Sequence, residues 1–174
     1  MKLILVRHAQ SKANARGIMQ GQKIDWTLSE LGRKQAKAVA DYLKKEKIEA
    51  IYSSDLKRAK HTADEIAKHH KVNIILDKKL REANHGKENI EHLIKRAKFI
   101  LNKVKKHNGT VIAVTHGGIG LTIMAVSTGN RKKGGELVKK TRLENASINI
   151  IHHNPKKNKW KIHTINKVVH KRCK

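Results

Sequence analysis

The sequence predicts an α/β fold with three layers, in which helices cover both faces of a mostly parallel central sheet with an antiparallel edge. Short apolar segments typical of buried strands alternate along the chain with longer segments of amphipathic helical periodicity. The 174 residues suit one compact domain. We expect this domain to span residues 1–166, followed by a basic tail at residues 167–174.

The N-terminal segment begins with an apolar run at residues 3–6 that ends abruptly in an Arg-His pair. A run of this kind is typical of a strand buried on both faces. Residues 9–28 lack sustained periodicity and predict a long loop, and long loops in compact domains are usually functional. Ser29 is a suitable N-cap for an amphipathic helix expected at residues 31–43.

The middle of the chain repeats the order of strand and helix twice. A strand is expected at residues 48–52, followed by a helix with Arg58 in its first turn, the end of a helix that attracts anions. A third strand is expected at residues 72–76, and residues 81–86 then form a loop. Residues 90–104 keep the i, i+3, i+4, i+7 apolar spacing of a long amphipathic helix.

The C-terminal third opens with residues 110–115, the strongest buried-strand pattern in the chain, followed by a helix to about Ser127. Residues 130–135 contain two glycines and predict a loop. Residues 146–151 and 160–165 predict two late strands on either side of the only proline, an arrangement typical of a hairpin. We expect this hairpin to form the antiparallel edge of the sheet.

The composition is strongly basic, with a formal net charge of +26. Such a charge favours anionic partners, which include phosphorylated metabolites, nucleic acid and acidic membrane surfaces. The lysines are scattered over every segment, which is equally consistent with a general lysine bias that only keeps the protein soluble. Aromatic residues make up 3% of the chain, which argues against single-strand binding by base stacking.

Targeting and metal-binding signals are absent from the sequence. No apolar run is long enough to span a bilayer and the N-terminus lacks the sections of a signal peptide, so we expect a cytoplasmic protein without membrane association. The single cysteine, Cys173, cannot form an internal disulfide and lies in the basic tail, where no catalytic pocket is expected. The adjacent pairs His69-His70 and His152-His153 lack the spacing of a closed zinc site, and we predict no bound metal.

Reactive side chains follow the predicted strands at the points where these strands end. Arg7 and His8 follow the first strand, Glu82 follows the third, and His116 follows the strongest strand. Arg58 opens the helix after the second strand. Each of these residues alone is more simply explained as an exposed charge or part of a turn. Because the carboxyl ends of parallel strands meet at one edge of a sheet, their repeated placement favours a shared site.

These residue types suit phosphoryl transfer. Guanidinium groups match phosphoryl oxygens bidentately. A neutral imidazole can attack phosphorus to form phosphohistidine, and nearby cationic charge favours that neutral form. A second histidine can donate hydrogen bonds to the oxygens whose charge is stabilised in the transition state. A protonated carboxyl group can give its proton to the leaving alkoxide.

Several blocks of the sequence resemble, in the same order, the motifs of the histidine phosphatase superfamily, the phosphoglycerate mutase-like proteins. They are LVRHAQS at residues 5–11, LSELG at residues 28–32, IYSSDLKRA at residues 51–59, LRE at residues 80–82, VTHGG at residues 114–118 and NASI at residues 145–148. The similarity covers nearly the whole chain to about residue 165. Ala9 and Gln10 depart from the family's glycine and acidic residue, and the Trp-Glu-Gly that often follows Gly86 is missing.

The resemblance implies a role for each residue of the site, in a reaction that uses neither a metal nor another cofactor. It implies that His8 is the phosphorylated nucleophile, and that Glu82 is the proton donor and later the base for water. Arg7, Arg58 and His116 complete the implied catalytic set. Contacts with the phosphate or the rest of the substrate are implied for Arg7, Asn14, Gln20, Gly21, Arg58 and His116.

The family includes phosphatases and mutases, and the sequence favours a phosphatase acting on a phosphorylated small molecule. The stretch between Glu82 and His116 is short, with one predicted helix where larger members carry insertions that cover the substrate. An open pocket admits water, which a mutase must exclude from phosphohistidine. We expect specificity to depend on residues 15–25, 83–89 and 130–142. A cofactor-dependent phosphoglycerate mutase remains the alternative within this fold.

Two further expectations concern macromolecular partners. A nucleic-acid-binding protein with an idle pocket is the alternative from another functional class, and the net charge is its only support. We rank it below the enzyme, because binding nucleic acid would not require two histidines, two arginines and a glutamate at one edge. An edge strand that pairs across a two-fold axis would also allow a homodimer.

Overall fold

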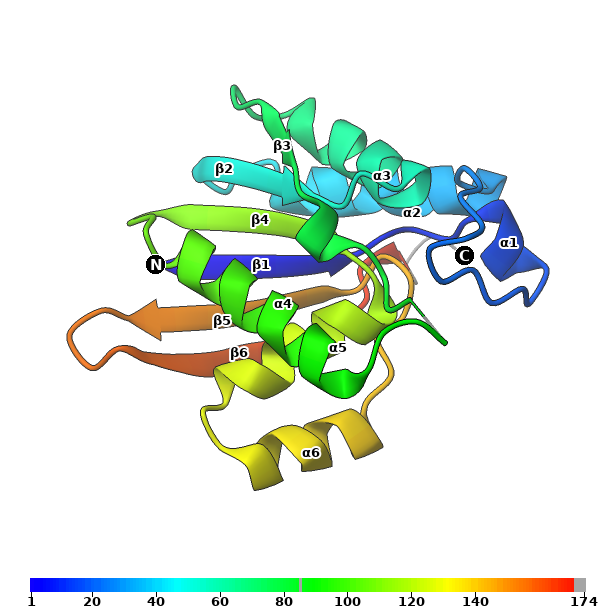
Figure 1. Ribbon diagram of the computed structural model, residues 1–174. Coiled ribbons are helices and arrows are strands. Elements are labelled where there is room, and N and C mark those ends of the chain that lie inside the picture. Colours follow the sequence, from blue (N-terminus) through cyan, green and yellow to red (C-terminus); the bar gives the residue numbers. More distant parts are fainter. Residues whose placement is uncertain (85, 171–174) are drawn as a thin grey trace.

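The computed structural model describes residues 1–84 and 86–170 and is built on a six-stranded sheet. The strands are β1 (Lys2–Arg7), β2 (Ile48–Ser53), β3 (Ile74–Leu76), β4 (Thr110–Thr115), β5 (Ile148–Asn154) and β6 (Lys159–Lys167). Their order in the sheet is β3-β2-β4-β1-β5-β6 (Figure 1). Strands β3, β2, β4 and β1 are parallel to one another. Strand β5 is antiparallel to β1, and β6 is antiparallel to β5. The predicted parallel sheet with an antiparallel edge is therefore confirmed.

Helices cover both faces of the sheet, as predicted. They are α1 (Lys12–Ala15), α2 (Glu30–Leu43), α3 (Lys57–Ala67), α4 (Ile90–Val104), α5 (Gly117–Ser127) and α6 (Arg131–Lys140), with a 3₁₀ turn η1 (Lys78–Leu80). Helices α2 and α3 pack on one face, and α4 and α5 pack on the other (Figure 1). Each face of the sheet has its own hydrophobic core, and the side chains of β1 alternate between them. Ile4 and Val6 lie in the core under α2 and α3, whereas Leu3 and Leu5 lie in the core under α4 and α5.

The register of the two central strands fixes the position of the residues that follow them. Strands β1 and β4 pair with Arg7 opposite Thr115, and the backbone N–H of His8 donates to the Thr115 carbonyl at 2.8 Å. His8 and His116 therefore leave the sheet side by side. The backbone N–H of Ser54, directly after β2, donates to the Val114 carbonyl at 3.0 Å and brings a third strand end to the same edge.

Residues 130–135 were expected to form a loop, and this prediction is wrong because they begin helix α6. Asn130 caps the helix, since its side-chain oxygen accepts a hydrogen bond from the N–H of Lys133. Gly134 lies against α5, and a Cβ there would come within 2.8 Å of the Ala125 carbonyl oxygen. A glycine that indicated a loop in the sequence thus allows two helices to pack closely.

The bounds of several expected elements shift by one to three residues: β3 begins at Ile74 in place of residue 72, and β5 spans Ile148–Asn154 in place of residues 146–151. The loop at residues 9–28 contains the short helix α1, whose N-cap Ser11 forms a capping box with Asn14. Strand β6 continues to Lys167, and Val169 packs against the core, so the domain boundary at residue 166 stays a prediction. Cys173 lies outside the described residues. No helix within the described part of the chain is long and apolar enough to cross a membrane.

Candidate active site

Two histidines form the centre of the site at the carboxyl edge of the sheet. His8 follows β1 and His116 is the N-cap residue of α5, and both side chains are buried. Their ring centroids are 5.0 Å apart and the rings are inclined by 59°. The strand-end histidines singled out in the sequence are therefore neighbours.

The hydrogen bonds of His8 leave one ring nitrogen free to react. Nδ1 lies 2.7 Å from the carbonyl oxygen of Ala9, which can only accept, so Nδ1 carries the proton and Nε2 keeps its lone pair. Burial, followed by the charges of Arg7 and Arg58, holds the pKa of His8 well below its ordinary value of 6.5. His8 is thus a neutral imidazole with an available nucleophilic nitrogen.

His116 has the opposite arrangement of ring nitrogens. Its Nε2 lies 2.9 Å from Oγ of Ser54, and that oxygen already accepts from the N–H of Leu56 at 3.3 Å. Among the described residues the Ser54 hydroxyl has no other acceptor, so we assign its proton to the bond with Nε2 of His116 and the ring proton to Nδ1. Nδ1 is buried without a hydrogen-bond partner among the described residues. Burial, with His8 next, holds the pKa of His116 well below 6.5, so a neutral donor faces the site.

Two arginines supply the positive charge around the histidines. Arg58 lies in the first turn of α3, as predicted, and donates to the carbonyl oxygens of Gly21 at 2.8 Å and Ile24 at 3.0 Å. Arg7 ends β1 and donates to the Leu143 carbonyl. The Nε atoms of both arginines are buried without a hydrogen-bond partner among the described residues. Unpaired N–H groups on two desolvated cations suit an anionic ligand.

Glu82 approaches the same point from the loop after η1. Its Oε1 accepts from the backbone N–H groups of Ala83 at 2.9 Å, Gly118 at 3.0 Å and Ile119 at 3.2 Å, so the carboxylate lies on the N-terminus of α5. A Cβ at Gly118 would lie 2.7 Å from Oε1, so a larger residue there would displace the carboxyl group of Glu82. A Cβ at Gly117 would contact both Oε2 of Glu82 and Nε of Arg7 at 3.7 Å, so these groups are close.

The remaining predicted residues lie in the long loop, with different environments. Oδ1 of Asn14 accepts from the backbone N–H and the hydroxyl of Ser11, so the amide nitrogen is the end left to bind a ligand. The side-chain oxygen of Gln20 is buried without a partner among the described residues, while Gly21 holds Arg58 through its carbonyl. A cavity of about 180 Å³ is lined by Met19, Gln20, Gly21, Gln22, Lys23 and Asn84.

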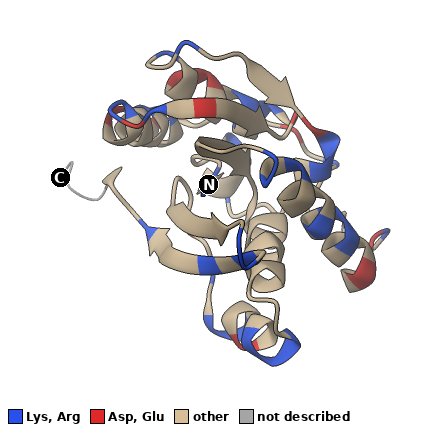
Figure 2. Ribbon diagram, turned by 90° about the vertical axis from the view of Figure 1, so that its left-hand side faces the viewer, with Lys and Arg blue, Asp and Glu red and all other residues tan. Residues whose placement is uncertain are grey.

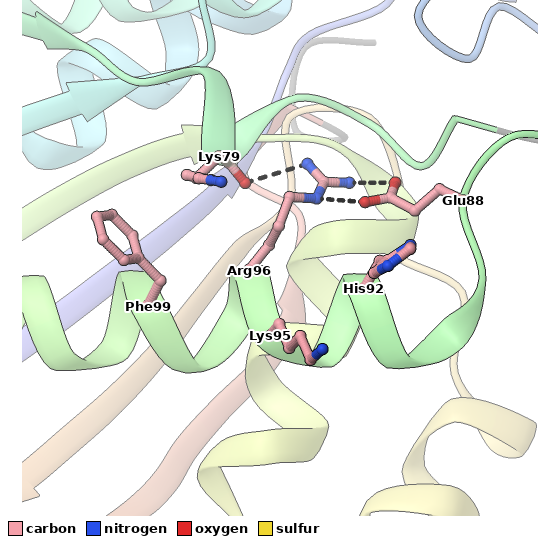
Figure 3. Close-up of a pocket in the computed structure, with 6 residues that line it drawn as sticks. All are labelled: Lys79, Glu88, His92, Lys95, Arg96 and Phe99. Atoms are coloured by element: carbon pink, nitrogen blue, oxygen red, sulfur yellow. Dashed lines mark hydrogen bonds and ion pairs between the residues drawn. The ribbon is translucent and has the colours of Figure 1, made fainter.

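A larger cavity of about 440 Å³ lies beside α4 and contains none of the predicted site residues. Figure 3 shows its lining: Lys79, Glu88, His92, Lys95, Arg96 and Phe99. This lining includes the ion pair between Arg96 and Glu88, at 2.7 Å. Among the described residues, no group of three or more His, Cys, Asp or Glu side chains is arranged to hold a metal ion.

Three side chains that position the site received no role from the sequence. Ser54 orients His116, Thr62 accepts from the N–H of Ala9 at 3.0 Å, and Asn145 donates to the His8 carbonyl at 3.0 Å. Ser54 directly follows β2, so its place at a strand end could have identified it. Thr62 and Asn145 lie far from His8 in sequence and in other elements, and their contacts depend on tertiary packing.

The family model described as the histidine phosphatase superfamily, branch 1, matches residues 3–88 and 85–167. The chain belongs to this superfamily. The resemblance noted in the sequence is therefore confirmed, and the site lies at the carboxyl edge where the family motifs converge.

Individual relatives of this histidine phosphatase agree with the assignment. A metal-independent phosphoserine phosphatase from Arabidopsis thaliana is 35% identical over 97% of this chain and 82% of its own length. Phosphoserine phosphatase 1 of Hydrogenobacter thermophilus is 48% identical over 49% of this chain and 40% of its own, so that alignment spans less than half of the relative. The solved structure of Bacillus stearothermophilus YhfR has a TM-score of 0.83 at 25% identity, covering 97% of this chain and 98% of that one. The Arabidopsis and Hydrogenobacter relatives are both named phosphatases, which agrees with the predicted phosphatase class.

Proposed function

We propose that this protein is a metal-independent phosphomonoesterase that transfers the phosphoryl group of a small substrate to Nε2 of His8 and then to water. The observation that carries the proposal is the buried pair of neutral histidines, flanked by the unpaired Nε atoms of Arg7 and Arg58. A dianionic phosphate would supply the partners that these buried donors lack.

The first step forms the phosphohistidine. Arg7, Arg58 and Nδ1–H of His116 bind the phosphoryl oxygens, and Asn14 adds its amide N–H. The lone pair on Nε2 of His8 forms a bond to phosphorus while the bond to the leaving oxygen breaks. Glu82 gives a proton from Oε2 to that oxygen, because Oε1 accepts from three backbone N–H groups whereas Oε2 only shares that of Gly118, at 3.2 Å. The product alcohol then leaves.

The second step reverses the role of Glu82. Its carboxylate takes a proton from a water molecule as the water oxygen bonds to phosphorus and the bond to Nε2 of His8 breaks. Inorganic phosphate is released, His8 is again neutral and Glu82 is again protonated. No atom or electron from a metal is needed in either step.

The decisive experiment is to trap the covalent intermediate. In the presence of a chelator, the wild type should hydrolyse an aryl phosphate and carry an acid-labile, alkali-stable phosphoryl group on His8 when quenched. His8→Ala should lose at least about 1,000-fold in kcat/KM, as is typical for removal of a covalent nucleophile. His152→Ala, an exchange at an exposed histidine of β5 that pairs with Lys2 at the opposite end of β1 from His8, is the matched control. Full activity in His8→Ala, or labelling at another residue, would refute the proposal.

The small cavity supports a compact, acidic substrate. Its volume of about 180 Å³ suits a short leaving group, Lys23 supplies a positive charge, and Gln22 and Asn84 supply amides. The named activities of the relatives lead us to propose phosphoserine or a similar phosphorylated small acid. A panel of phosphorylated amino acids, sugar acids and sugars, assayed with wild type and Lys23→Met, tests this. A preference for uncharged leaving groups would contradict it.

A different assay distinguishes the proposed phosphatase from the alternative, a cofactor-dependent phosphoglycerate mutase. Between the Glu82 loop and β4 the described residues contribute one helix, α4, so we expect the site to stay open to water. An assay primed with 2,3-bisphosphoglycerate should therefore give hydrolysis and no interconversion of phosphoglycerates. Sustained interconversion would favour the mutase.

The proposed substrate also supports the cytoplasmic location expected from the sequence. An ionised phosphate ester crosses a lipid bilayer only at a large desolvation cost, so an enzyme acting on such metabolites works where they are made. Cell fractionation with an antibody against the native chain measures this, and recovery with the membrane fraction would contradict it.

A further inference from the structure

Arg96 on α4 connects the cavity of about 440 Å³ to the loop that carries Glu82. Its side chain is buried, with 11% exposure, and it pairs bidentately with Glu88, which is 12% exposed. Figure 3 shows the guanidinium reaching from α4 to Glu88, with Nε and one terminal nitrogen each facing a carboxylate oxygen at 2.7 Å. Pairing of this geometry fixes the plane of the guanidinium.

The remaining N–H groups of Arg96 hold the backbone on both sides of Glu82. One terminal nitrogen donates to the carbonyl oxygens of Lys79 at 3.1 Å and Arg81 at 2.7 Å, and the other to that of Glu82 itself at 3.3 Å. Glu88 completes the connection, because its Oε2 accepts from the backbone N–H of Asn84 at 3.1 Å. The Arg96 side chain thus binds four groups of the segment at residues 79–88: three backbone carbonyls and the Glu88 carboxylate.

All five N–H groups of Arg96 are used by these contacts. An arginine in this state has nothing left to bind a phosphate, which distinguishes it from Arg7 and Arg58 with their unpaired Nε atoms. Lysine could replace it only in part, because an ammonium group has three donors and no planar fork. Arg96 therefore acts on the protein and not on the substrate.

We propose that Arg96 is a positioning residue for the proton donor: with Glu88, it holds the Glu82 loop so that the Glu82 carboxyl group reaches the leaving oxygen. The inference rests on the proposed role of Glu82. Catalytic geometry is sensitive to small displacements, since about 1 Å of misplacement can cost about 100-fold in rate. Loss of Arg96 would remove three backbone anchors from the loop while leaving the two histidines and two arginines in place.

The test uses substrates that differ in their need for a proton. Leaving groups such as 2,4-dinitrophenolate depart without protonation, whereas an alkoxide requires it. Arg96→Met should lower kcat/KM for an alkyl phosphate by about 10- to 100-fold, while kcat/KM for 2,4-dinitrophenyl phosphate stays near that of the wild type. The ratio kcat/KM reports formation of the phosphohistidine and is independent of its later hydrolysis, in which Glu82 acts as the base for both substrates. Glu82→Gln should show the same pattern more strongly. Arg96→Lys should recover part of the loss for the alkyl ester.

Two further variants separate positioning from folding. Lys95→Met changes an exposed cation that lines the same cavity and should leave both activities unchanged. The double variant Arg96→Met/Glu88→Gln removes the unpaired buried carboxylate, so its melting temperature should rise above that of Arg96→Met while the alkyl ester remains poor. Recovery of alkyl-ester activity together with stability would show that Arg96 matters only for folding, and would overturn the inference.

The outcome for Glu82→Gln decides which idea fails. Suppose that Glu82→Gln lowers kcat/KM for the alkyl ester only, whereas Arg96→Met lowers kcat/KM for both substrates equally. The inference about Arg96 is then overturned and the proposed mechanism stands. If Glu82→Gln lowers kcat/KM for both substrates equally, Glu82 is not the proton donor, and the inference fails with that assignment.

Discussion

The imidazole rings of His8 and His116 are chemically distinguished by the single hydrogen bond that each ring makes to the protein. The carbonyl of Ala9 accepts from Nδ1 of His8, whereas the hydroxyl of Ser54 lies on Nε2 of His116. One ring therefore presents a lone pair to the site and the other presents an N–H. The same residue type can thus serve as nucleophile and as donor, because each neighbour selects one tautomer.

A consequence at this scale is that acid should destabilise the folded protein through these histidines. Burial is the main cause of the lowered pKa of His8 and of His116, both well below 6.5. Below pH 6.5 the unfolded chain binds protons at these positions and the folded chain does not. The free energy of unfolding should fall as pH falls, by up to about 1.4 kcal/mol per pH unit for each histidine, and be independent of them above pH 6.5.

Urea denaturation between about pH 5 and 7.5 measures this slope. The matched control is the variant His8→Asn/His116→Asn, which should show a shallower dependence over the same range because the two buried rings are gone. An equal slope in the two proteins would mean that these histidines are protonated in the folded state and are not the neutral groups that the mechanism needs.

At the scale of elements, the sequence was sufficient to predict the sheet and insufficient to predict α6. Residues 110–115 and 3–6 are apolar almost without interruption, and their pattern alone identifies buried strands. Gly134 and Gly135 weaken the helical pattern of α6, because glycine is a poor helix former in isolation. Only the packing against Ala125 shows why Gly134 is tolerated there.

These two glycines provide a matched pair of substitutions. Gly134→Ala places a Cβ within 2.8 Å of the Ala125 carbonyl oxygen, so we expect a loss of about 1–3 kcal/mol in the free energy of unfolding. A Cβ at Gly135 would meet nothing within 4 Å beyond the adjacent backbone of its own helix, and Gly135→Ala should gain about 0.5–1 kcal/mol from helix propensity. Chemical denaturation measures both. Equal effects would show that α6 does not pack on α5 through Gly134.

The same division between local pattern and tertiary contact applies to the site. Arg7, His8, Glu82 and His116 could be placed together because each follows a strand end, and parallel strands bring such ends to one edge. Arg96 could not be found in this way, since it lies in the middle of a helix and its partners are backbone carbonyls of another segment. Backbone acceptors carry no sequence signal.

At the scale of the whole molecule, the charge is dispersed. The chain has 40 Lys and Arg residues against 14 Asp and Glu, and Figure 2 shows basic positions on helices, strands and loops of the face it draws. A nucleic-acid-binding surface would be expected to concentrate such charge on one element or stripe. With a net charge of +26 dispersed in this way, we expect a broad positive potential that attracts small anions.

Ionic strength should therefore affect the rate of substrate binding more than the rate of the chemical step. Raising the salt concentration from about 0.01 M to 0.15 M shortens the Debye length from about 30 Å to about 8 Å. We expect kcat/KM for a dianionic phosphate ester to fall about tenfold over this range while kcat stays constant, since screening weakens attraction of the free substrate. The variant Lys139→Glu/Lys140→Glu, on exposed positions of α6, should show a shallower salt dependence of kcat/KM with the same kcat.

A parallel fall in kcat would indicate that salt acts on the catalytic groups themselves. An unchanged kcat/KM would mean that the positive charge does not serve substrate capture, and the nucleic-acid alternative would then be tested by the salt dependence of duplex binding.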